Sequence, residues 1–221
     1  MNITRREFAL GTGAVALASG GILAGLSMAG FERPALAQNP PLDELMKPGP
    51  LGDMALGNEK APVTIIEYAS MTCPHCAHFH EATYPDLKTK YIDTGKVRFI
   101  FREFPLDQLA AAAFMLARCG GSKDRYFPMI EILFQQQRDW VVQRPLQPLM
   151  AIAKQAGMSE QTFNECLKDQ KVLDGIEEGR QRASKLFGVQ STPTFFINGK
   201  IFRGSGTLAE FEKEMAPYLK S

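Results

Sequence analysis

The sequence predicts an α/β fold with an inserted helical subdomain, and three observations support this class. Residues 63–69 and 97–104 are two apolar runs rich in β-branched and aromatic residues. Two further short strands surround the turn signal Asn198-Gly199. Between these pairs, about eighty residues from Asp107 onward carry a helical pattern. A small sheet with helices on both faces fits this order.

The first half of the fold is expected to alternate between strand and helix. Residues 63–69 form the first strand, and a helix starts beside Cys73 and continues to about residue 92. Pro85 is expected to kink this helix, because proline lacks the N–H that a helix interior needs. Residues 97–104 then form a second strand.

The second half is expected to be helical as far as a terminal hairpin. Ser159, after Gly157, has the residue type of a helix start. Residues 194–197 and 200–203 form the two strands of the hairpin, and residues 207–219 close the chain as a helix. The preceding helical windows are residues 109–119, 124–140, 145–156, 159–169 and 172–187.

The first 37 residues have the pattern of an export signal. Arg5-Arg6 precede an uncharged stretch over residues 8–31, and Ala35-Leu36-Ala37 is a small-residue cleavage pattern. The arginine pair resembles the twin-arginine signal. The alternative is an uncleaved membrane anchor, since the stretch is long enough to span a bilayer. We expect cleavage after Ala37.

Three segments are therefore expected along the chain. They are a signal peptide at residues 1–37, an extended arm at 38–60, and a domain at 61–221 with its helical insertion at about 107–187. Without the three arginines and two glutamates of the signal, the chain's 25 basic and 24 acidic residues become equal in number. This balance gives no argument for nucleic acid or an anionic membrane surface. In an oxidising compartment the four cysteines are potential disulfides.

Cys73-Pro74-His75-Cys76 is the motif that carries chemistry. Two cysteines two residues apart, directly after a strand, place a dithiol at the first turn of a helix. There the free N–H groups and the helix dipole stabilise a thiolate, so the pKa of a cysteine falls below its usual value of about 8.5. Cys73, at the helix start, is expected to be the exposed nucleophile. Cys76, one turn deeper, is the resolving thiol.

A metal site is the alternative use of these cysteines, with His78 and His80 as further ligands. Residues two apart on a helix point about 200° away from each other, so both histidines cannot face one ion in an unbroken helix. Copper(I) favours thiolates, yet the sequence has no Met-rich or His-rich tract. We expect redox chemistry without metal or cofactor. His78 and His80 are expected to lie on the helix surface or to be partly buried by packing.

Cys119 and Cys166 lie in two helical windows of the insertion, 47 residues apart. Two remaining cysteines in an exported subdomain are expected to pair. Closing a loop of this length stabilises a fold by a few kcal/mol on the chain-entropy model. Two free buried thiols are the alternative.

The motifs together resemble a known fold. Glu67, the Cys73–Cys76 motif, Thr192-Pro193-Thr194 and the terminal hairpin with its helix are similar to the thioredoxin fold. The helical block between the two halves resembles that of the DsbA family of periplasmic thiol–disulfide oxidoreductases. This likeness covers about residues 60–219. A CxxC after a strand, combined with a Thr-Pro before the last hairpin, is far more specific than the CxxC alone.

The resemblance implies roles for the residues that surround the dithiol. Pro193 is expected to form a cis peptide bond with Thr192 and to place the Thr192 backbone opposite Cys73, where an extended substrate peptide pairs with it. Pro74-His75 is typical of oxidising members. His75 is expected to donate toward the Cys73 thiolate or to place positive charge beside it.

Glu67 is an acid inside an otherwise apolar strand, six residues before Cys73. A buried carboxylate costs free energy unless it is paired or protonated. By the resemblance, Glu67 lies beneath Cys76 and takes its proton. A strand-edge carboxylate that points to water is the alternative.

The expected function is that of a monomeric periplasmic enzyme that donates disulfides to exported proteins with reduced cysteines. The family implies a DsbB-like membrane partner that re-oxidises it. An isomerase or reductase of the same fold is the nearest alternative. A holdase or a copper- or zinc-binding module is the alternative from a different class.

Overall fold

The computed structural model describes residues 39–203 and 206–219. The expected export signal and its cleavage site, at residues 1–37, lie outside the described residues. In the part of the chain that is described, no helix combines the length and the apolar character needed to cross a lipid bilayer.

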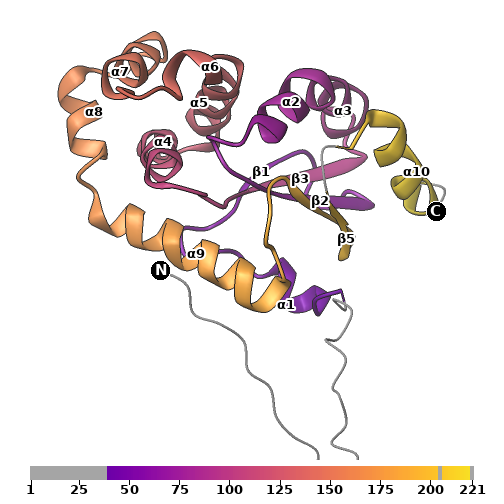
Figure 1. Ribbon diagram of the computed structural model, residues 1–221. Coiled ribbons are helices and arrows are strands. Elements are labelled where there is room, and N and C mark those ends of the chain that lie inside the picture. The colour runs from indigo at the N-terminus through magenta and orange to yellow at the C-terminus, as the bar shows by residue number, and fades with distance from the viewer. Residues whose placement is uncertain (1–38, 204–205, 220–221) are drawn as a thin grey trace, which may run out of the picture. The chain divides into compact units, whose positions relative to one another are not determined.

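Within the described residues, a mixed sheet of five strands forms the centre of the fold (Figure 1). The strands are β1 (Met54–Leu56), β2 (Val63–Ala69), β3 (Val97–Glu103), β4 (Thr194–Ile197) and β5 (Lys200–Arg203). They lie in the order β1-β3-β2-β4-β5. β2 runs parallel to β3, and the other neighbours are antiparallel. β2 is therefore the central strand, and the chain leaves its C-terminal end directly into the segment that carries the dithiol.

Helices cover both faces of the sheet (Figure 1). In Figure 1, α9 and α1 lie below the sheet, and α2, α3 and the insertion helices α4 to α8 lie above it. The bounds are α1 (Leu42–Met46), α2 (Pro74–Ala82), α3 (Tyr84–Leu87), the π-helical turn η1 (Lys88–Ile92), α4 (Gln108–Cys119), α5 (Lys123–Gln135), α6 (Gln137–Trp140), α7 (Leu146–Gln155), α8 (Glu160–Cys166), α9 (Gln170–Phe187) and α10 (Leu208–Leu219).

The period-two alternation of β2 divides its side chains between two cores. Ile65 packs in the core shared with α2, α10 and the insertion. Ile66 and Tyr68 pack on the opposite face with Leu45 of α1 and Phe187 of α9. Glu67 shares the face of Ile65, because successive strand residues point to opposite sides. The acid therefore points toward α2, where the dithiol lies.

The predicted α/β class with an inserted helical block is confirmed. Two helices differ from their predictions. The expected helix from Cys73 to residue 92 is interrupted at Thr83 and continues as α3 and η1, and the expected helix over residues 124–140 is divided at Gln136 into α5 and α6. Pro85 lies directly after the break at Thr83 and has no N–H to donate to the preceding turn. The Thr83 hydroxyl instead donates to the carbonyl of Gly206, at 3.2 Å.

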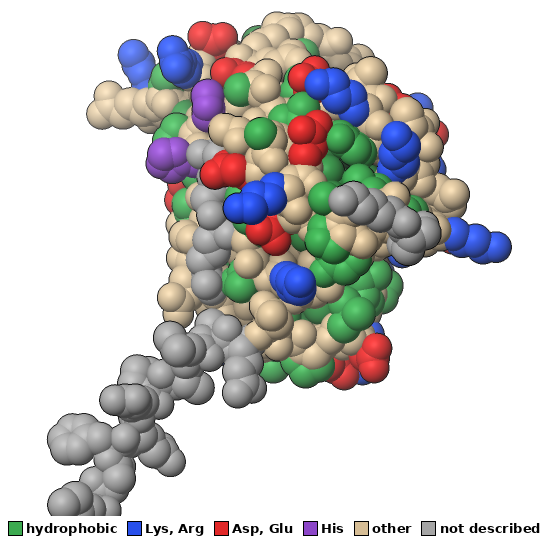
Figure 2. Space-filling view, turned by 90° about the vertical axis from the view of Figure 1, so that its right-hand side faces the viewer, with side chains coloured by type: hydrophobic (Ala, Val, Ile, Leu, Met, Phe, Trp, Pro, Cys, Tyr) green, Lys and Arg blue, Asp and Glu red, His purple; other side chains and the backbone are tan. Residues whose placement is uncertain are grey.

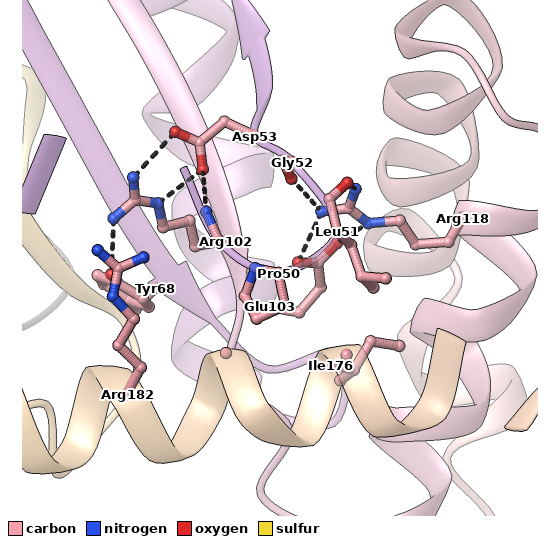
Figure 3. A pocket seen from close by; sticks show the side chains of 13 residues that line it. Pro50, Leu51, Gly52, Asp53, Tyr68, Arg102, Glu103, Arg118, Ile176 and Arg182 are labelled. Atoms are coloured by element: carbon pink, nitrogen blue, oxygen red, sulfur yellow. Dashed lines mark hydrogen bonds and ion pairs between the residues drawn. The ribbon is translucent and has the colours of Figure 1, made fainter. Parts of the chain in front are cut away.

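The arm at residues 38–60 takes part in the fold to an extent that its composition does not predict. Its β1 strand pairs with β3, with Met54 opposite Phe101. Arg102 of β3 forms a bidentate ion pair with Asp53, and both nitrogen–oxygen distances are 2.9 Å (Figure 3). Arg102 also donates to the carbonyl of Leu45 at 2.8 Å. Arg118 of α4 donates to the carbonyls of Leu51 and Gly52.

Arg182 of α9 completes these contacts, since it donates to the carbonyls of Glu44, Lys47 and Pro48. Three arginines from three different elements thus bind arm carbonyls that have no strand or helix partner. Gly175 makes room for the arm on α9, because a Cβ there would lie 2.5 Å from Leu51 Cδ2. The arm is therefore packed as part of the domain.

Cys119 and Cys166 form a disulfide between the C-terminal ends of α4 and α8, with their Cα atoms 5.7 Å apart. The bond joins two helices of the insertion. It lies at the far end of α4 from Asp107, the N-cap of that helix.

Candidate active site

The dithiol lies where β2 ends and α2 begins. Cys73 has extended backbone angles and is the N-cap of α2, and Pro74 takes the first helical position, where its missing N–H leaves no bond unmade. Cys76 is fully buried one turn later, and Cys73 is only 5% exposed. Cys73 was expected to be exposed, but it is almost completely buried because the loop at Thr192 packs directly on its sulfur.

Two side chains from the insertion fix the backbone that carries Cys73. Gln137 of α6 donates from Nε2 to the carbonyls of Met71 and Cys73, at 2.8 and 3.0 Å. Thr72 donates from its hydroxyl to Asp107 at 2.6 Å, and Asp107 in turn accepts from the N–H of Ala110 as the cap of α4. The insertion therefore holds the approach to the dithiol from two sides.

The loop before β4 faces the dithiol. The peptide bond between Thr192 and Pro193 is cis. The Cys73 thiol donates to the carbonyl of Thr192 at 3.2 Å. The Thr192 hydroxyl is buried and, among the described residues, has no hydrogen-bond partner while Cys73 is a thiol, so it is free to donate to a thiolate at Cys73. The described geometry thus brings Thr192 and Pro193 against Cys73 across 119 residues of sequence.

The two thiols have opposite acidities. Hydrogen bonding from the Cys76 thiol is the largest cause that lowers the pKa of Cys73 to about 5; the side chain of Thr192 and the backbone N–H groups of Cys76 and His75 contribute further, against the opposing effect of burial. Burial, the hydrogen bond to Cys73 and the negative charge of Glu67 raise the pKa of Cys76 well above that of an ordinary thiol. At neutral pH the site therefore favours a thiolate at Cys73 and a thiol at Cys76.

Glu67 is fully buried on β2, and its carboxylate pairs with His80 of α2. The distance from His80 Nε2 to Glu67 Oε2 is 2.9 Å, with both side chains almost completely buried. His80 was expected to have only a surface or packing role, but its main polar contact in the structure is the Glu67 carboxylate. His78, by contrast, is exposed.

The side chains of the remaining predicted residues, His75, Cys119 and Cys166, do not contact the dithiol in any hydrogen bond given above. The His75 side chain is exposed, and its contribution to the thiolate comes through its backbone N–H. Cys119 and Cys166 belong to the insertion and take no part in the contacts of the dithiol described above. Within residues 39–203 and 206–219, no cluster of three or more His, Cys, Asp or Glu side chains could hold a metal ion.

Three residues of the site were missed by reasoning from the sequence: His80, Gln137 and Asp107. His80 carries a usable signal, because it lies four residues after Cys76 on the same helix face and a buried acid needs a partner. Asp107 precedes a run of helix formers, which is the pattern of an N-cap. Gln137 carries no local signal, since its partners are backbone carbonyls 66 and 64 residues away.

The site and the fold agree with comparisons to known proteins. A family model described as thioredoxin matches residues 51–215. The chain belongs to the thioredoxin family. The crystal structure of Wolbachia pipientis alpha-DsbA1 is similar to this chain with a TM-score of 0.75 and 34% identity, covering 81% of this chain and 96% of that one.

Curated relatives carry related names. A protein-disulfide oxidoreductase from Rickettsia typhi is 36% identical over 148 residues, which is 66% of this chain and 55% of the relative. The chain thus spans about half the length of the Rickettsia proteins it matches. A disulfide bond formation protein D from Bacillus cereus is 28% identical and is covered to 70%. Both relatives have names that refer to disulfide chemistry.

Proposed function

We propose that this protein is a thiol–disulfide oxidoreductase that donates a Cys73–Cys76 disulfide to exported proteins. The observation that carries the proposal is the opposed acidity of the two thiols, with a Cys73 pKa of about 5 and a raised Cys76 pKa. A stabilised Cys73 thiolate is a good leaving group, and it favours the reduced form of the enzyme. A dithiol of this kind tends to pass its disulfide to other proteins.

The reaction exchanges one disulfide for another. A substrate thiolate attacks Cys73 Sγ, the Cys73–Cys76 bond breaks, and the released Cys76 thiolate takes a proton. The second substrate thiolate then attacks the substrate sulfur of the mixed disulfide and expels Cys73 as its thiolate. Two electrons pass from the substrate dithiol to the enzyme, and the substrate leaves with a disulfide.

Two neighbours of the dithiol have proposed roles in these steps. Glu67 exchanges the Cys76 proton, which its buried position on the α2 side of β2 supports. Thr192 and Pro193 receive the substrate, because the Thr192 backbone lies directly against Cys73. The peptide groups of an extended substrate chain would pair with the backbone of this loop.

The setting of this activity is also a proposal. The export pattern of residues 1–37 supports a periplasmic location reached by a twin-arginine-type signal. Continuous turnover needs an oxidant, and a DsbB-like membrane protein is the kind of partner that would supply it. Its clients would be exported proteins with reduced cysteines, and we expect it to act as a monomer.

A redox titration of Cys73–Cys76 against glutathione tests the direction of electron flow. An oxidase should have a potential near that of DsbA, about −120 mV, whereas a reductase would lie near thioredoxin, about −270 mV. Refolding of a reduced client and insulin reduction, compared with a Cys73→Ser variant, connect this potential to activity. A thioredoxin-like potential with efficient insulin reduction would reject the oxidase and favour the reductase.

A further inference from the structure

The buried pair of Glu67 and His80 is more than packing. His80 Nε2 lies 2.9 Å from Glu67 Oε2, and the side chains are 3% and 0% exposed. The imidazole stacks on Phe134 with ring centroids 4.4 Å apart and an angle of 22°. Tyr84 lies against it with a centroid distance of 4.7 Å. Burying an ionisable pair in such an aromatic core costs free energy, so packing alone does not explain why these two residues are there.

Each member of the pair also has one polar atom without a partner. Glu67 Oε1 and His80 Nδ1 are buried and make no hydrogen bond to any group in residues 39–203 and 206–219. Because the other atom of each side chain is paired, these two are free to exchange a proton with a third group. The negative charge of Glu67 acts on the Cys76 thiol, and His80 follows Cys76 by one helical turn on the same face of α2. Cys76 is therefore the neighbour whose chemistry needs a proton.

The need for a proton arises when the disulfide breaks. Cys76 leaves as a thiolate, in a site that disfavours its charge through burial and the nearby carboxylate. Cys76 is fully buried, so bulk water has poor access to it. A proton held close by would make Cys76 a better leaving group, and the same acceptor would take the proton back when the disulfide forms again.

We propose that His80 stores the proton that Glu67 passes to Cys76, so that the Glu67–His80 pair is the acid and base of the Cys76 half-reaction. This proposal rests on thiol–disulfide exchange at Cys73–Cys76. When the pair carries the stored proton, it consists of a carboxylate with an imidazolium, or of a carboxylic acid with a neutral imidazole. That proton moves to Cys76 Sγ as the sulfur–sulfur bond breaks, and it returns when Cys76 attacks a mixed disulfide at Cys73. His80 acts through Glu67 and is thus a positioning residue.

Other titratable groups face the pair from the neighbouring elements. Those on which the charge of Glu67 acts are Cys76 on α2, Tyr84 on α3 and Tyr126 on α5. Glu131 on α5 acts in turn on Tyr84, and Glu103 on β3 acts on Tyr126. Burial raises the pKa of Tyr84 and of Tyr126, and the charge of Glu67 adds to both shifts, so both phenols stay protonated at neutral pH. Glu103 is engaged by Arg118 and by the Tyr126 hydroxyl.

The test compares His80→Gln with wild type in the full-length oxidised protein. Glutamine keeps a hydrogen-bond donor toward Glu67 but cannot hold the extra proton. Stopped-flow reduction by dithiothreitol, from pH 5 to pH 9, measures release of Cys76 without any client. We expect the variant to be about tenfold slower or more at neutral pH. After correction for the dithiothreitol thiolate, the ratio of the wild-type rate to the variant rate should be smaller at pH 9 than at pH 5, because only the wild type draws on a stored proton.

A double-mutant cycle shows whether His80 acts through Glu67. In a Glu67→Gln background, His80→Gln should have no further effect on the rate. His78→Gln is the matched control, because His78 lies on the same helix and is exposed. Figure 2 shows histidine side chains on the surface of the molecule, where a histidine exchanges protons with water directly. This control should keep the wild-type rate and pH profile.

Two results would overturn the proposal. One is a folded His80→Gln protein with the wild-type rate at every pH, and the other is an effect that persists undiminished in the Glu67→Gln background. If His80→Gln does not fold, Glu67→Gln is compared with Glu67→Gln/His80→Leu, which removes the buried charge pair. Equal rates are then expected, both at least tenfold below wild type, and a second drop would reject the mechanism. A thioredoxin-like potential would reject the oxidase alone and leave this test unchanged.

Discussion

At the scale of single residues, the acidity of Cys73 depends on donors that point at one sulfur. The Cys76 thiol makes the largest contribution, and Thr192 adds another from the opposite side of the site. Among the described residues the Thr192 hydroxyl has no other partner, so it is free to donate a hydrogen bond to a thiolate at Cys73. Burial opposes ionisation and is outweighed. Removing a single donor should therefore be visible in the titration of Cys73.

Thr192→Val should raise the pKa of Cys73 above its value of about 5. Valine keeps the shape of threonine and removes only the hydroxyl. A hydrogen bond to a charged group contributes about 1.5–3 kcal/mol, which sets the upper range of the effect. Ultraviolet absorbance of the thiolate as a function of pH measures it. Thr192→Ser, which keeps the hydroxyl, should stay close to wild type, and an unchanged midpoint in Thr192→Val would contradict the assignment.

Residues of the site differ in how far the sequence could predict them. Cys73, Cys76 and Glu67 are within ten residues of each other, and the strand and helix periods place them together. Thr192 comes to the site only through the pairing of β2 with β4, which the resemblance supplied. Gln137 depends on how α6 packs on the loop before α2. Such contacts are set by tertiary packing, for which the local sequence carries no signal.

At the scale of elements, strong local patterns gave accurate bounds and weak ones did not. Ser159 caps α8 as its residue type predicts, accepting from the N–H of Thr162. The three residues of β1 have no such pattern, and they become a strand because β3 offers a free edge. The break at Thr83 was likewise unpredicted in position, although Pro85 gave its cause. Elements that depend on a distant partner are those that the sequence leaves open.

The disulfide between α4 and α8 allows a prediction at this scale. Replacing Cys119 and Cys166 together by alanine should lower the free energy of unfolding by about 4 kcal/mol, since the bond closes a loop of 47 residues. Urea unfolding followed by circular dichroism measures the loss. The pKa of Cys73 should stay near 5, because the contacts of α4 with the dithiol segment lie at the other end of the helix, at Asp107. A marked shift of that pKa would indicate that the second disulfide tunes the active site.

At the scale of the whole molecule, the arm is joined to the rest of the domain by an ion pair that is almost completely buried. The side chains of Arg102 and Asp53 are 7% and 8% exposed. Removing one partner of a buried pair leaves an uncompensated charge and costs about 3–5 kcal/mol. Asp53→Asn should therefore destabilise the protein by an amount near the lower end of that range, because asparagine keeps one acceptor. Chemical unfolding measures it.

The matched control for this pair is an exposed one on the same domain. Lys154 and Glu160 are paired at 3.1 Å with both side chains more than half exposed. Pairs of this kind contribute about 0–1 kcal/mol, so Glu160→Gln should change stability little. Equal effects of Asp53→Asn and Glu160→Gln would mean that the Arg102–Asp53 pair contributes no more to stability than an exposed pair.

The acidity of one cysteine also determines how the stability of the whole protein depends on pH. In the folded reduced protein the pKa of Cys73 is about 5, against about 8.5 for an unfolded thiol. The lowered value stabilises the folded reduced form in full above pH 8.5, and this contribution is lost as pH falls toward 5. The oxidised form has no thiol at this position, so it lacks the contribution.

The reduced form should therefore gain stability over the oxidised form between about pH 5 and pH 8. Above that range the raised pKa of Cys76 opposes the gain, because the unfolded thiol then ionises more easily than the folded one. Thermal unfolding of both forms at several pH values measures this difference in stability. Reduced Cys73→Ser has no thiol at residue 73, so it should lack the gain in stability between pH 5 and pH 8. A difference that falls as pH rises would mean that Cys73 is not the stabilised thiolate, and the driving force for giving away the disulfide would then need another source.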